Sequence, residues 1–526
     1  MEKLFEQLCI CTELIEAGVA SHTCNIAWLN KFCATFHKFA SEFKIYLPCK
    51  TDLTRYNKIQ METIYLCFTQ VLTCITNLER IMHTERNFEL FATRNHFINR
   101  INWCLRLLHA SLSQLSEDAQ LDLNLDDLSF VELLDVVLDK LETFNEIVPE
   151  LQHSVSIRSL DLDGQFHDAI NHIIRHALAF ANVALEADKK ALNSLCQRVL
   201  DESSQFEHNF EQHSAEERKL ESLALQRCIY CLETYLNEAL LRLVFASLLD
   251  VEEMSVKKLK TALETKENTT LVPQLIAELD LNMDRIQQIG VFAIAFSQEA
   301  KTKTIVRSCL ASLEALDSVL VPAFQLQTTP SAVQHADLLE QHFNEELMTF
   351  RNIIHEIIDS QALISNYLDL LADSIQNAEQ LYPSGELLQI ARMGNVILQH
   401  FQLEENFQIL SIDGIRLYQD FLLILGECQA VLELGTSVDL KRIVKRFKIL
   451  YSILAKLRED LWKNANQVNA SLNDKSITNP NQSIYCSKRQ ISFAKQRSRV
   501  GSKTIHNLSN NSDLISFQLT EILQIN

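Results

Sequence analysis

Glycine and proline are scarce in this chain of 526 residues. The sequence contains 9 Gly and 7 Pro, whereas average usage would give roughly 37 and 26. Tight turns and β-hairpins depend on these residues, so a chain poor in them has few turns and long elements. Hydrophobic residues make up 47% of the sequence, which is enough to build a folded core. We therefore predict an all-α protein.

Apolar residues recur at alternating steps of three and four over much of the sequence. In residues 64–82 the series is Ile64, Phe68, Val71, Ile75, Leu78 and Met82, and residues 130–148 and 440–461 repeat it. This spacing puts a narrow apolar seam on one side of each helix and favours near-parallel packing. Helix-breaking residues interrupt the series every few dozen residues, which indicates consecutive antiparallel bundles rather than one long coiled coil.

The helix breakers also suggest where domains begin and end. Pro48 is predicted to end a helix that begins near Asn25, and Pro322 and Pro330 mark another break. An acidic stretch at 116–129 separates the first helices from the rest. We predict an N-terminal bundle at 1–120, a middle bundle at 121–270 and a C-terminal bundle at 271–474. Residues 475–526 are predicted to be a basic flexible tail with a short terminal helix.

Charge is distributed very unevenly along the chain, whose formal net charge is −20. Residues 308–437 carry a net charge of −15, whereas residues 438–526 carry +9. A cationic end therefore follows directly on an anionic neighbour. Such asymmetry points to a contact surface for a negatively charged partner.

The segment "VDLKRIVKRFKILYSILAKLRED" (438–460) concentrates this positive charge. Its basic residues are Lys441, Arg442, Lys445, Arg446 and Lys448, all predicted to lie outside the apolar seam of one helix. Ser437 is a plausible cap for this helix. Ile449 and Ile453 lie beside the charges, where an apolar side chain gains little unless a partner covers it. An ordinary solvated helix face is the alternative interpretation.

A cationic face flanked by apolar residues suits anionic lipid headgroups or an acidic protein filament. The tail adds further candidate residues for actin or lipid binding, which are Lys488, Arg489, Lys495, Arg497 and Arg499. Nucleic acid is a poor partner, because the remaining chain is strongly negative and would repel it.

Candidate metal and catalytic motifs are weak. Asp168, His172 and His176 share one helical face, but the metalloprotease pattern requires Glu where Ile173 stands. Cys228 and Cys231 sit among core-like residues and are better explained as structural. Phosphate-binding and nucleophile motifs do not occur. We predict no metal, no cofactor and no enzymatic activity.

The expected location is the cytoplasm. No run of about 18 uncharged apolar residues is present to span a membrane, and the start of the chain lacks a signal-peptide core. Fourteen cysteines in a chain this long are more typical of reduced thiols in a cytosolic protein than of a disulfide framework.

Two stretches, "AWLNKFCATFHKFASEFKIYLP" (27–48) and "METIYLCFTQVLTCITNLERIM" (61–82), carry a family resemblance. The chain resembles the Serendipity alpha family of insects, which is similar to vinculin and α-catenin. The resemblance implies antiparallel helical bundles and a non-enzymatic role in cellularisation of the syncytial blastoderm embryo. There the protein is expected to act at the inner face of the invaginating plasma membrane and to organise actin filaments. A dimeric structural spacer that binds neither actin nor lipid is the alternative.

Overall fold

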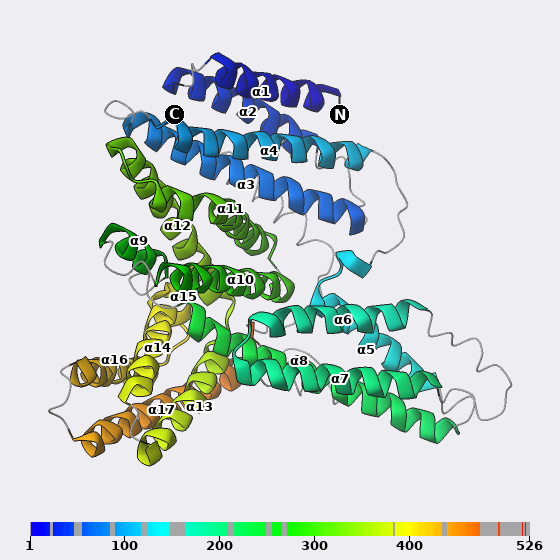
Figure 1. Ribbon diagram of the computed structural model, residues 1–526. Helices are drawn as coiled ribbons and strands as arrows, with labels where there is room; N and C mark the ends of the chain where they lie inside the picture. Colours follow the sequence, from blue (N-terminus) through cyan, green and yellow to red (C-terminus); the bar gives the residue numbers. More distant parts are fainter. Residues whose placement is uncertain are drawn as a thin grey trace.

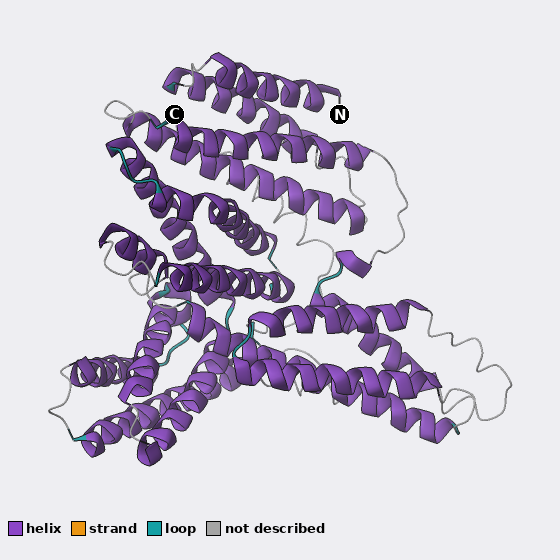
Figure 2. Cartoon of the chain, in the orientation of Figure 1, coloured by secondary structure: helices purple, strands orange, loops and turns teal. Residues whose placement is uncertain are grey.

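Turn-poor segments of the sequence form helices in the structure (Figure 2). The computed structural model describes residues 2–21, 25–46, 55–84, 90–116, 125–147, 164–208, 214–248, 255–265, 271–297, 299–381, 384–433, 439–473, 493–494, 518 and 521. Within these ranges the backbone forms α-helices, one short 3₁₀ helix and an isolated β-bridge between Ile358 and Ala494. The all-α prediction is confirmed.

The helices form four groups in space (Figure 1). The first contains α1 (Glu2–Ser21), α2 (Ile26–Tyr46), α3 (Arg55–Thr84) and α4 (Phe91–Ser116). The second contains η2 (Leu125–Asp127), α5 (Phe130–Ile147), α6 (Gly164–Val183), α7 (Glu186–His208) and α8 (Ala215–Ser247). The third contains α9 (Ser255–Thr265), α10 (Val272–Phe296), α11 (Ala300–Gln325) and α12 (Pro330–Ile357). The fourth contains α13 (Ser360–Leu381), α14 (Ser384–Gln402), α15 (Glu404–Phe407), α16 (Ile412–Glu433) and α17 (Leu440–Asn473).

Two hydrophobic cores hold these groups together. One is built from α1–α4 and extends from Leu4 to Leu115, with Leu338 of α12 as an added member. The other runs without interruption from Leu128 to Ala494. Because this second core is continuous, the predicted boundary at residue 270 has no matching gap in the packing. The division into 1–120, 121–270 and 271–474 stays a prediction.

A row of phenylalanines forms the centre of the first core. Phe36, Phe39 and Phe43 of α2 follow the helical spacing of three and four, and each ring packs against Phe68 of α3. The three ring centroids lie 5.4, 5.8 and 5.8 Å from that of Phe68. Such aromatic contacts are within the favourable range for offset and tilted pairs. The α2–α3 pairing thus follows directly from the apolar seam in the sequence.

Polar side chains join the first group to the third. Gln70 of α3 donates hydrogen bonds to the Ser308 carbonyl oxygen and to Ser312 Oγ of α11, both at 2.8 Å. Arg100 of α4 donates to Gln70 Oε1, also at 2.8 Å. Gln70 is buried, so without these partners its polar atoms would have no hydrogen bonds, because water cannot replace them there. The contact between the two cores is therefore specified by hydrogen bonds as well as by apolar packing.

Helix ends agree with the predicted breaks at the start of α2 and between α11 and α12. The Trp28 N–H donates to Asn25 Oδ1 at 2.9 Å, so α2 begins where the sequence indicates. Pro322, however, lies inside α11, which continues to Gln325. The predicted break between Pro322 and Pro330 is nevertheless confirmed, since α11 ends at Gln325 and α12 begins at Pro330. Pro330 does start α12, in the first helical position that suits proline.

Candidate functional site

The cationic helix of the sequence is α17, which begins at Leu440. Asp439 precedes it and caps its first turn, since its backbone oxygen accepts from the Arg442 and Ile443 N–H groups at 2.9 and 3.3 Å. The side chain of Asp439 also accepts from the Lys441 N–H at 3.2 Å. Ser437, the cap predicted from the sequence, lies outside the described residues.

The apolar seam of α17 is buried as predicted. Its buried members are Ile443, Phe447, Leu450, Leu454, Leu457 and Leu461. They pack against α13 and α16, and the helix runs along the lower edge of the molecule in Figure 1. Burial of this seam fixes the rotation of α17 about its axis. The opposite face is consequently directed to solvent.

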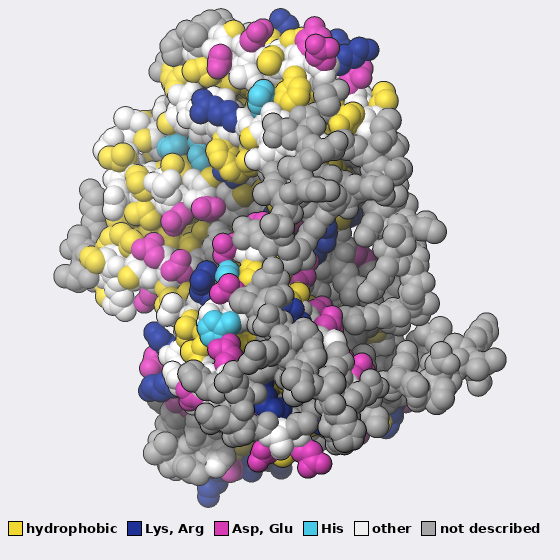
Figure 3. All heavy atoms as spheres, turned by 90° about the vertical axis from the view of Figure 1, so that its right-hand side faces the viewer, with side chains coloured by type: hydrophobic (Ala, Val, Ile, Leu, Met, Phe, Trp, Pro, Cys, Tyr) yellow, Lys and Arg dark blue, Asp and Glu magenta, His cyan; other side chains and the backbone are white. Residues whose placement is uncertain are grey.

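All five predicted basic residues of α17 lie off the seam. Lys441, Arg442, Lys445 and Lys448 are exposed, whereas Arg446 is half-buried. On the face drawn in Figure 3, Lys and Arg side chains of the described residues are interspersed with Asp and Glu. The first three turns of α17 instead carry charge of a single sign. The predicted outer position of these side chains is therefore confirmed, while their binding role stays a prediction.

Two of the five basic residues pair with carboxylates of the acidic region 308–437. Arg446 Nε lies 3.4 Å from Glu427 Oε2 of α16, and Lys448 Nζ lies 2.5 Å from Glu379 Oε1 of α13. The side chains of Lys448 and Glu379 are 56% and 49% exposed. Exposed pairs of this kind contribute about 0–1 kcal/mol. Both contacts can consequently open at little cost.

Lys441, Arg442 and Lys445 make no side-chain hydrogen bond or ion pair with the part of the chain that the structure describes. Two further lysines, Lys456 and Lys463, are also exposed on α17. Together with Lys441, Lys445 and Lys448 they follow helical spacing and form a stripe on the outer face. Lys456 and Lys463 were not predicted from the sequence. Their positions eight and fifteen residues after Lys448 could have indicated them, because such spacing places residues on one face of a helix. We call these five lysines the lysine stripe.

Apolar residues lie beside the lysine stripe. Ile449 is 41% exposed, whereas Ile453 is half-buried against the second core. Ile449 thus fits the expectation of an uncovered apolar side chain next to the charges, and Ile453 fits it only in part. Contact of a partner with the exposed Ile449 side chain would be favourable, because it would remove apolar surface from water.

The tail candidates Lys488, Arg489, Lys495, Arg497 and Arg499 lie outside the described residues. Phe493 and Ala494, between them in sequence, are described and are only 0% and 8% exposed. The prediction of a flexible tail is wrong at these two residues, because their side chains and backbone are held by three helical elements.

The histidines that suggested a metal have other contacts. His172 Nε2 lies 2.8 Å from Asp126 Oδ1, and its Nδ1 lies 2.7 Å from the backbone oxygen of Asp168. The ring of His176 packs edge-on against Phe130, and burial lowers the pKa of His176. Among the described residues no group of three or more His, Cys, Asp or Glu side chains is arranged to hold a metal ion.

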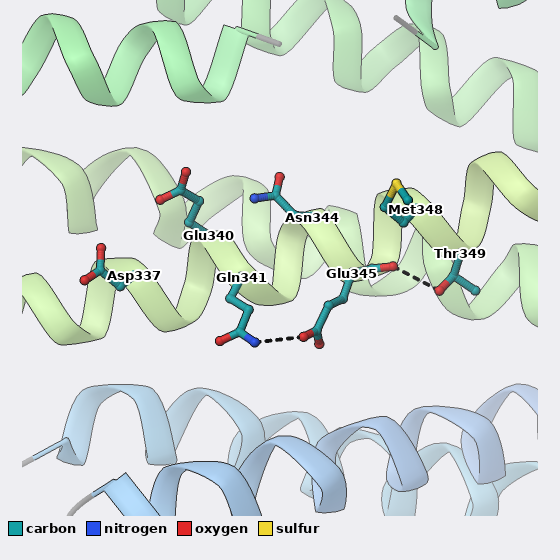
Figure 4. A pocket seen from close by; sticks show the side chains of 7 residues that line it. All are labelled: Asp337, Glu340, Gln341, Asn344, Glu345, Met348 and Thr349. Atoms are coloured by element: carbon teal, nitrogen blue, oxygen red, sulfur yellow. Dashed lines mark hydrogen bonds between the residues drawn. The ribbon is translucent and has the colours of Figure 1, made fainter. Parts of the chain in front are cut away.

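A hollow lies over one face of α12 (Figure 4). Its lining consists of Asp337, Glu340, Gln341, Asn344, Glu345, Met348 and Thr349. Lys260 Nζ lies 2.7 Å from Asp337 Oδ1 and 2.5 Å from Glu340 Oε2. Arg80 pairs with Glu345 at 3.0 Å. Since one helix supplies the whole lining and its carboxylates are paired, this hollow lacks converging groups for acid–base chemistry.

None of the described helices combines the length and the apolar character that a membrane crossing requires.

Comparison with known proteins identifies the family. The family described as "Serendipity locus alpha protein (SRY-A)" matches residues 1–526. The chain belongs to this Serendipity alpha family. Similar relatives, each named Serendipity locus protein alpha, come from three flies. Identity is 57% over 545 residues for Drosophila virilis, 50% over 559 for Drosophila pseudoobscura pseudoobscura and 48% over 555 for Drosophila subobscura, with all of both chains covered each time. The predicted family resemblance is confirmed.

A solved vinculin homologue from a sponge is similar in fold to this member of the Serendipity alpha family. The TM-score is 0.51 at 13% sequence identity, and the match covers 91% of this chain. The chain spans 60% of the length of the sponge protein. The predicted vinculin-type arrangement of helical bundles is thereby confirmed as a fold.

Proposed function

We propose that the protein is a non-enzymatic adaptor whose α17 binds a negatively charged surface. The partners would be actin filaments and the anionic inner face of the plasma membrane, to which the protein attaches peripherally from the cytoplasm. In this proposal it organises actin filaments at the membrane that invaginates during cellularisation of the syncytial embryo. The cellular role rests on the family resemblance, and the contact surface rests on the geometry of α17.

The lysine stripe carries the proposal. Lys441 and Lys463 are 22 positions apart, which corresponds to about 33 Å along a helix, long enough to contact several headgroups or acidic side chains. Ile449 adds an apolar contact beside the charges. A cationic helix face with apolar neighbours is suited to the boundary between headgroups and acyl chains. The same charge suits an acidic filament.

The central test neutralises the cationic turns. We expect the variant with Gln at positions 441, 442, 445, 446 and 448 to lose binding to filamentous actin and to acidic liposomes. Since each basic residue near an anionic surface contributes roughly 1 kcal/mol, the five substitutions should lower affinity by about three to four orders of magnitude. Cosedimentation across a salt series measures the loss. Binding by the unmodified chain should itself weaken as salt rises.

A matched control removes the same number of charges elsewhere. Lys31 and Lys38 of α2, Lys190 of α7, and Lys257 and Lys258 of α9 are all exposed. Their replacement by Gln gives the same net charge and should leave binding nearly unchanged. Equal loss in both variants would mean that net charge rather than α17 governs binding. Retained binding by the α17 variant would exclude a contact made through the first three turns of α17. If the unmodified chain binds neither ligand and has a doubled mass in solution, the structural spacer is correct.

The acidic neighbours of α17 lead to a second prediction. Glu379 and Glu427 each hold a basic side chain of this helix, so they partly mask the positive surface. We expect the double variant Glu379→Gln with Glu427→Gln to bind acidic liposomes about threefold to tenfold more tightly, because weak exposed pairs are removed. Liposome flotation at low salt measures the change. Unchanged affinity would contradict masking by these two residues.

A further inference from the structure

A short piece of the chain, Phe493–Ala494, is inserted into the second core. Phe493 and Ala494 follow the end of α17, Asn473, by about twenty residues, yet Phe493 is fully buried. Their contacts are with α8, with the end of α10 and with the junction between α12 and α13. The inserted dipeptide thus connects three elements from the middle of the chain.

The backbone of the dipeptide is held like an added strand. The Phe493 N–H donates to Asn237 Oδ1 at 3.2 Å, and the Asp359 N–H donates to the Phe493 oxygen at 2.9 Å. Ala494 forms an antiparallel bridge with Ile358. The Phe493 ring packs against that of Phe296, with centroids 5.8 Å apart. Main-chain hydrogen bonds combined with one anchoring side chain are typical of peptide recognition by strand addition.

The residues that receive the dipeptide are positioned by contacts of their own. Asn237 Nδ2 donates to the Glu233 oxygen at 2.9 Å, which orients the side-chain oxygen toward the dipeptide. The Ile358 N–H donates to the Ile354 oxygen at 3.0 Å, and Asp359 Oδ1 accepts from the Ala362 N–H at 2.8 Å. These bonds belong to helices α8, α12 and α13. The receiving slot is therefore built without help from Phe493 or Ala494.

An acidic hollow adjoins the slot. Ala494 lines it together with Glu299, Glu356 and Glu405, while Lys301 is its one basic lining residue. Three carboxylates against one ammonium group favour a ligand with basic residues beside the Phe-Ala pair. The chain's own sequence around this pair is "KRQISFAKQRSR" (488–499). Its composition therefore matches the charge of the hollow.

We propose that Asn237, Phe296, Ile358 and Asp359 form a peptide-binding slot for an extended Phe-Ala segment flanked by basic residues, and that Phe493–Ala494 occupies it reversibly. The ligand class is a basic peptide with one aromatic anchor. Occupation by the tethered segment keeps external peptides out, since a tethered ligand acts at an effective concentration in the millimolar range. The slot is distinct from the lysine stripe, and its test is independent of actin or lipid binding.

The test uses a fluorescent peptide with the sequence of residues 487–500. Fluorescence anisotropy is measured with the full chain, with Phe493→Leu and with Phe493→Ala. We expect Phe493→Ala to bind the peptide at least about tenfold more tightly than the unmodified chain, because its slot no longer has a tethered competitor. Phe493→Leu should lie between them. This milder replacement keeps a large apolar side chain, so it serves if the Ala variant folds poorly.

Two controls separate the slot from simple charge attraction. A peptide in which Ala replaces the phenylalanine keeps every charge. Its affinity for the Phe493→Ala chain should be about as low as the affinity of the original peptide for the unmodified chain. Adding Asn237→Ala to Phe493→Ala should weaken binding severalfold, because the acceptor for the peptide N–H is lost. Equal affinity for all three chains, or full binding by the peptide without phenylalanine, would overturn the proposal.

Discussion

Replacing Asp188 by Ala should lower the free energy of unfolding by about 3–5 kcal/mol, which is the range for breaking one half of a buried ion pair. Asp188 lies in the first turn of α7 and is 3% exposed. Its carboxylate accepts from Arg242 Nη2 at 2.8 Å and from Arg242 Nε at 3.1 Å. It also accepts from the Tyr235 hydroxyl at 2.9 Å. The substitution would leave the mostly buried Arg242 without its main partner.

Chemical unfolding in urea, followed by circular dichroism, measures this loss. The double variant Asp188→Ala with Arg242→Met should recover most of it, because a buried pair replaced by apolar groups is often nearly neutral. Glu186→Ala is the matched control on the same helix. Its partner Lys190 is 3.5 Å away, and both side chains are 76% exposed, so its effect should stay within about 0.5 kcal/mol. Similar losses for Asp188→Ala and Glu186→Ala would contradict the structural role given to Asp188.

Acidification from about pH 8 to about pH 5 should destabilise the protein by a net amount of roughly 4 kcal/mol, because three buried histidines contribute a loss of about 6 kcal/mol and a buried glutamate offsets about 2 kcal/mol of it. Burial lowers the pKa of His96 to about 4 and those of His342 and His355 to about 3. In the unfolded chain these groups take up protons below about pH 6.5. Stability is therefore fully present above that pH and is lost as pH falls, by about 2 kcal/mol per histidine at pH 5.

Glu346 works in the opposite direction. Burial raises the pKa of its carboxyl to about 7, so the folded state takes up a proton between about pH 7 and pH 4.5 while the unfolded state does not. Stability from this group increases as pH falls, by about 2 kcal/mol at pH 5. The three histidines outweigh it, which leaves the net loss given above.

Single substitutions separate the two contributions. His355 is 1% exposed, and neither ring nitrogen has a hydrogen-bond partner in the described part of the chain. His355→Leu should reduce the loss between pH 8 and pH 5 by about 2 kcal/mol, whereas Glu346→Gln should increase it by about the same amount. His83→Leu, at an exposed position, is the control. The urea unfolding midpoint of each variant is measured at pH 8 and at pH 5. If both test variants changed the loss of stability in the same direction, the opposite roles given to His355 and Glu346 would be contradicted.

Local features of the sequence predicted the secondary structure and the outward position of the basic residues of α17. The shortage of glycine and proline indicated long helices, and the apolar seam of α17 placed Lys441, Arg442, Lys445, Arg446 and Lys448 on the outer side. Asn25 marked the start of α2 correctly. These predictions succeeded because helix formation and seam orientation depend on residues within a few turns of one another.

Predictions failed where a local signal competed with its surroundings. Pro322 did not mark the exact end of α11, which continues three residues further to Gln325. Arg242 is a charged residue within an otherwise apolar segment, and its buried ion pair explains its presence there. Its partner, Asp188 of α7, could not be predicted from sequence spacing. Each outcome required knowledge of what lies next to the residue in space.

The sequence alone determined that this protein consists of helices with apolar seams, and that one late helix presents positive charge outward. Only the tertiary structure decided which helices meet: Gln70 binds Ser308 of a helix more than two hundred residues away, and Phe493 binds Asn237 across a similar separation. The same is true of Glu379 and Glu427, which pair with Lys448 and Arg446 of α17. Helical periodicity reports how a segment faces its core, whereas the choice of partner depends on shape and hydrogen bonds between surfaces distant in sequence.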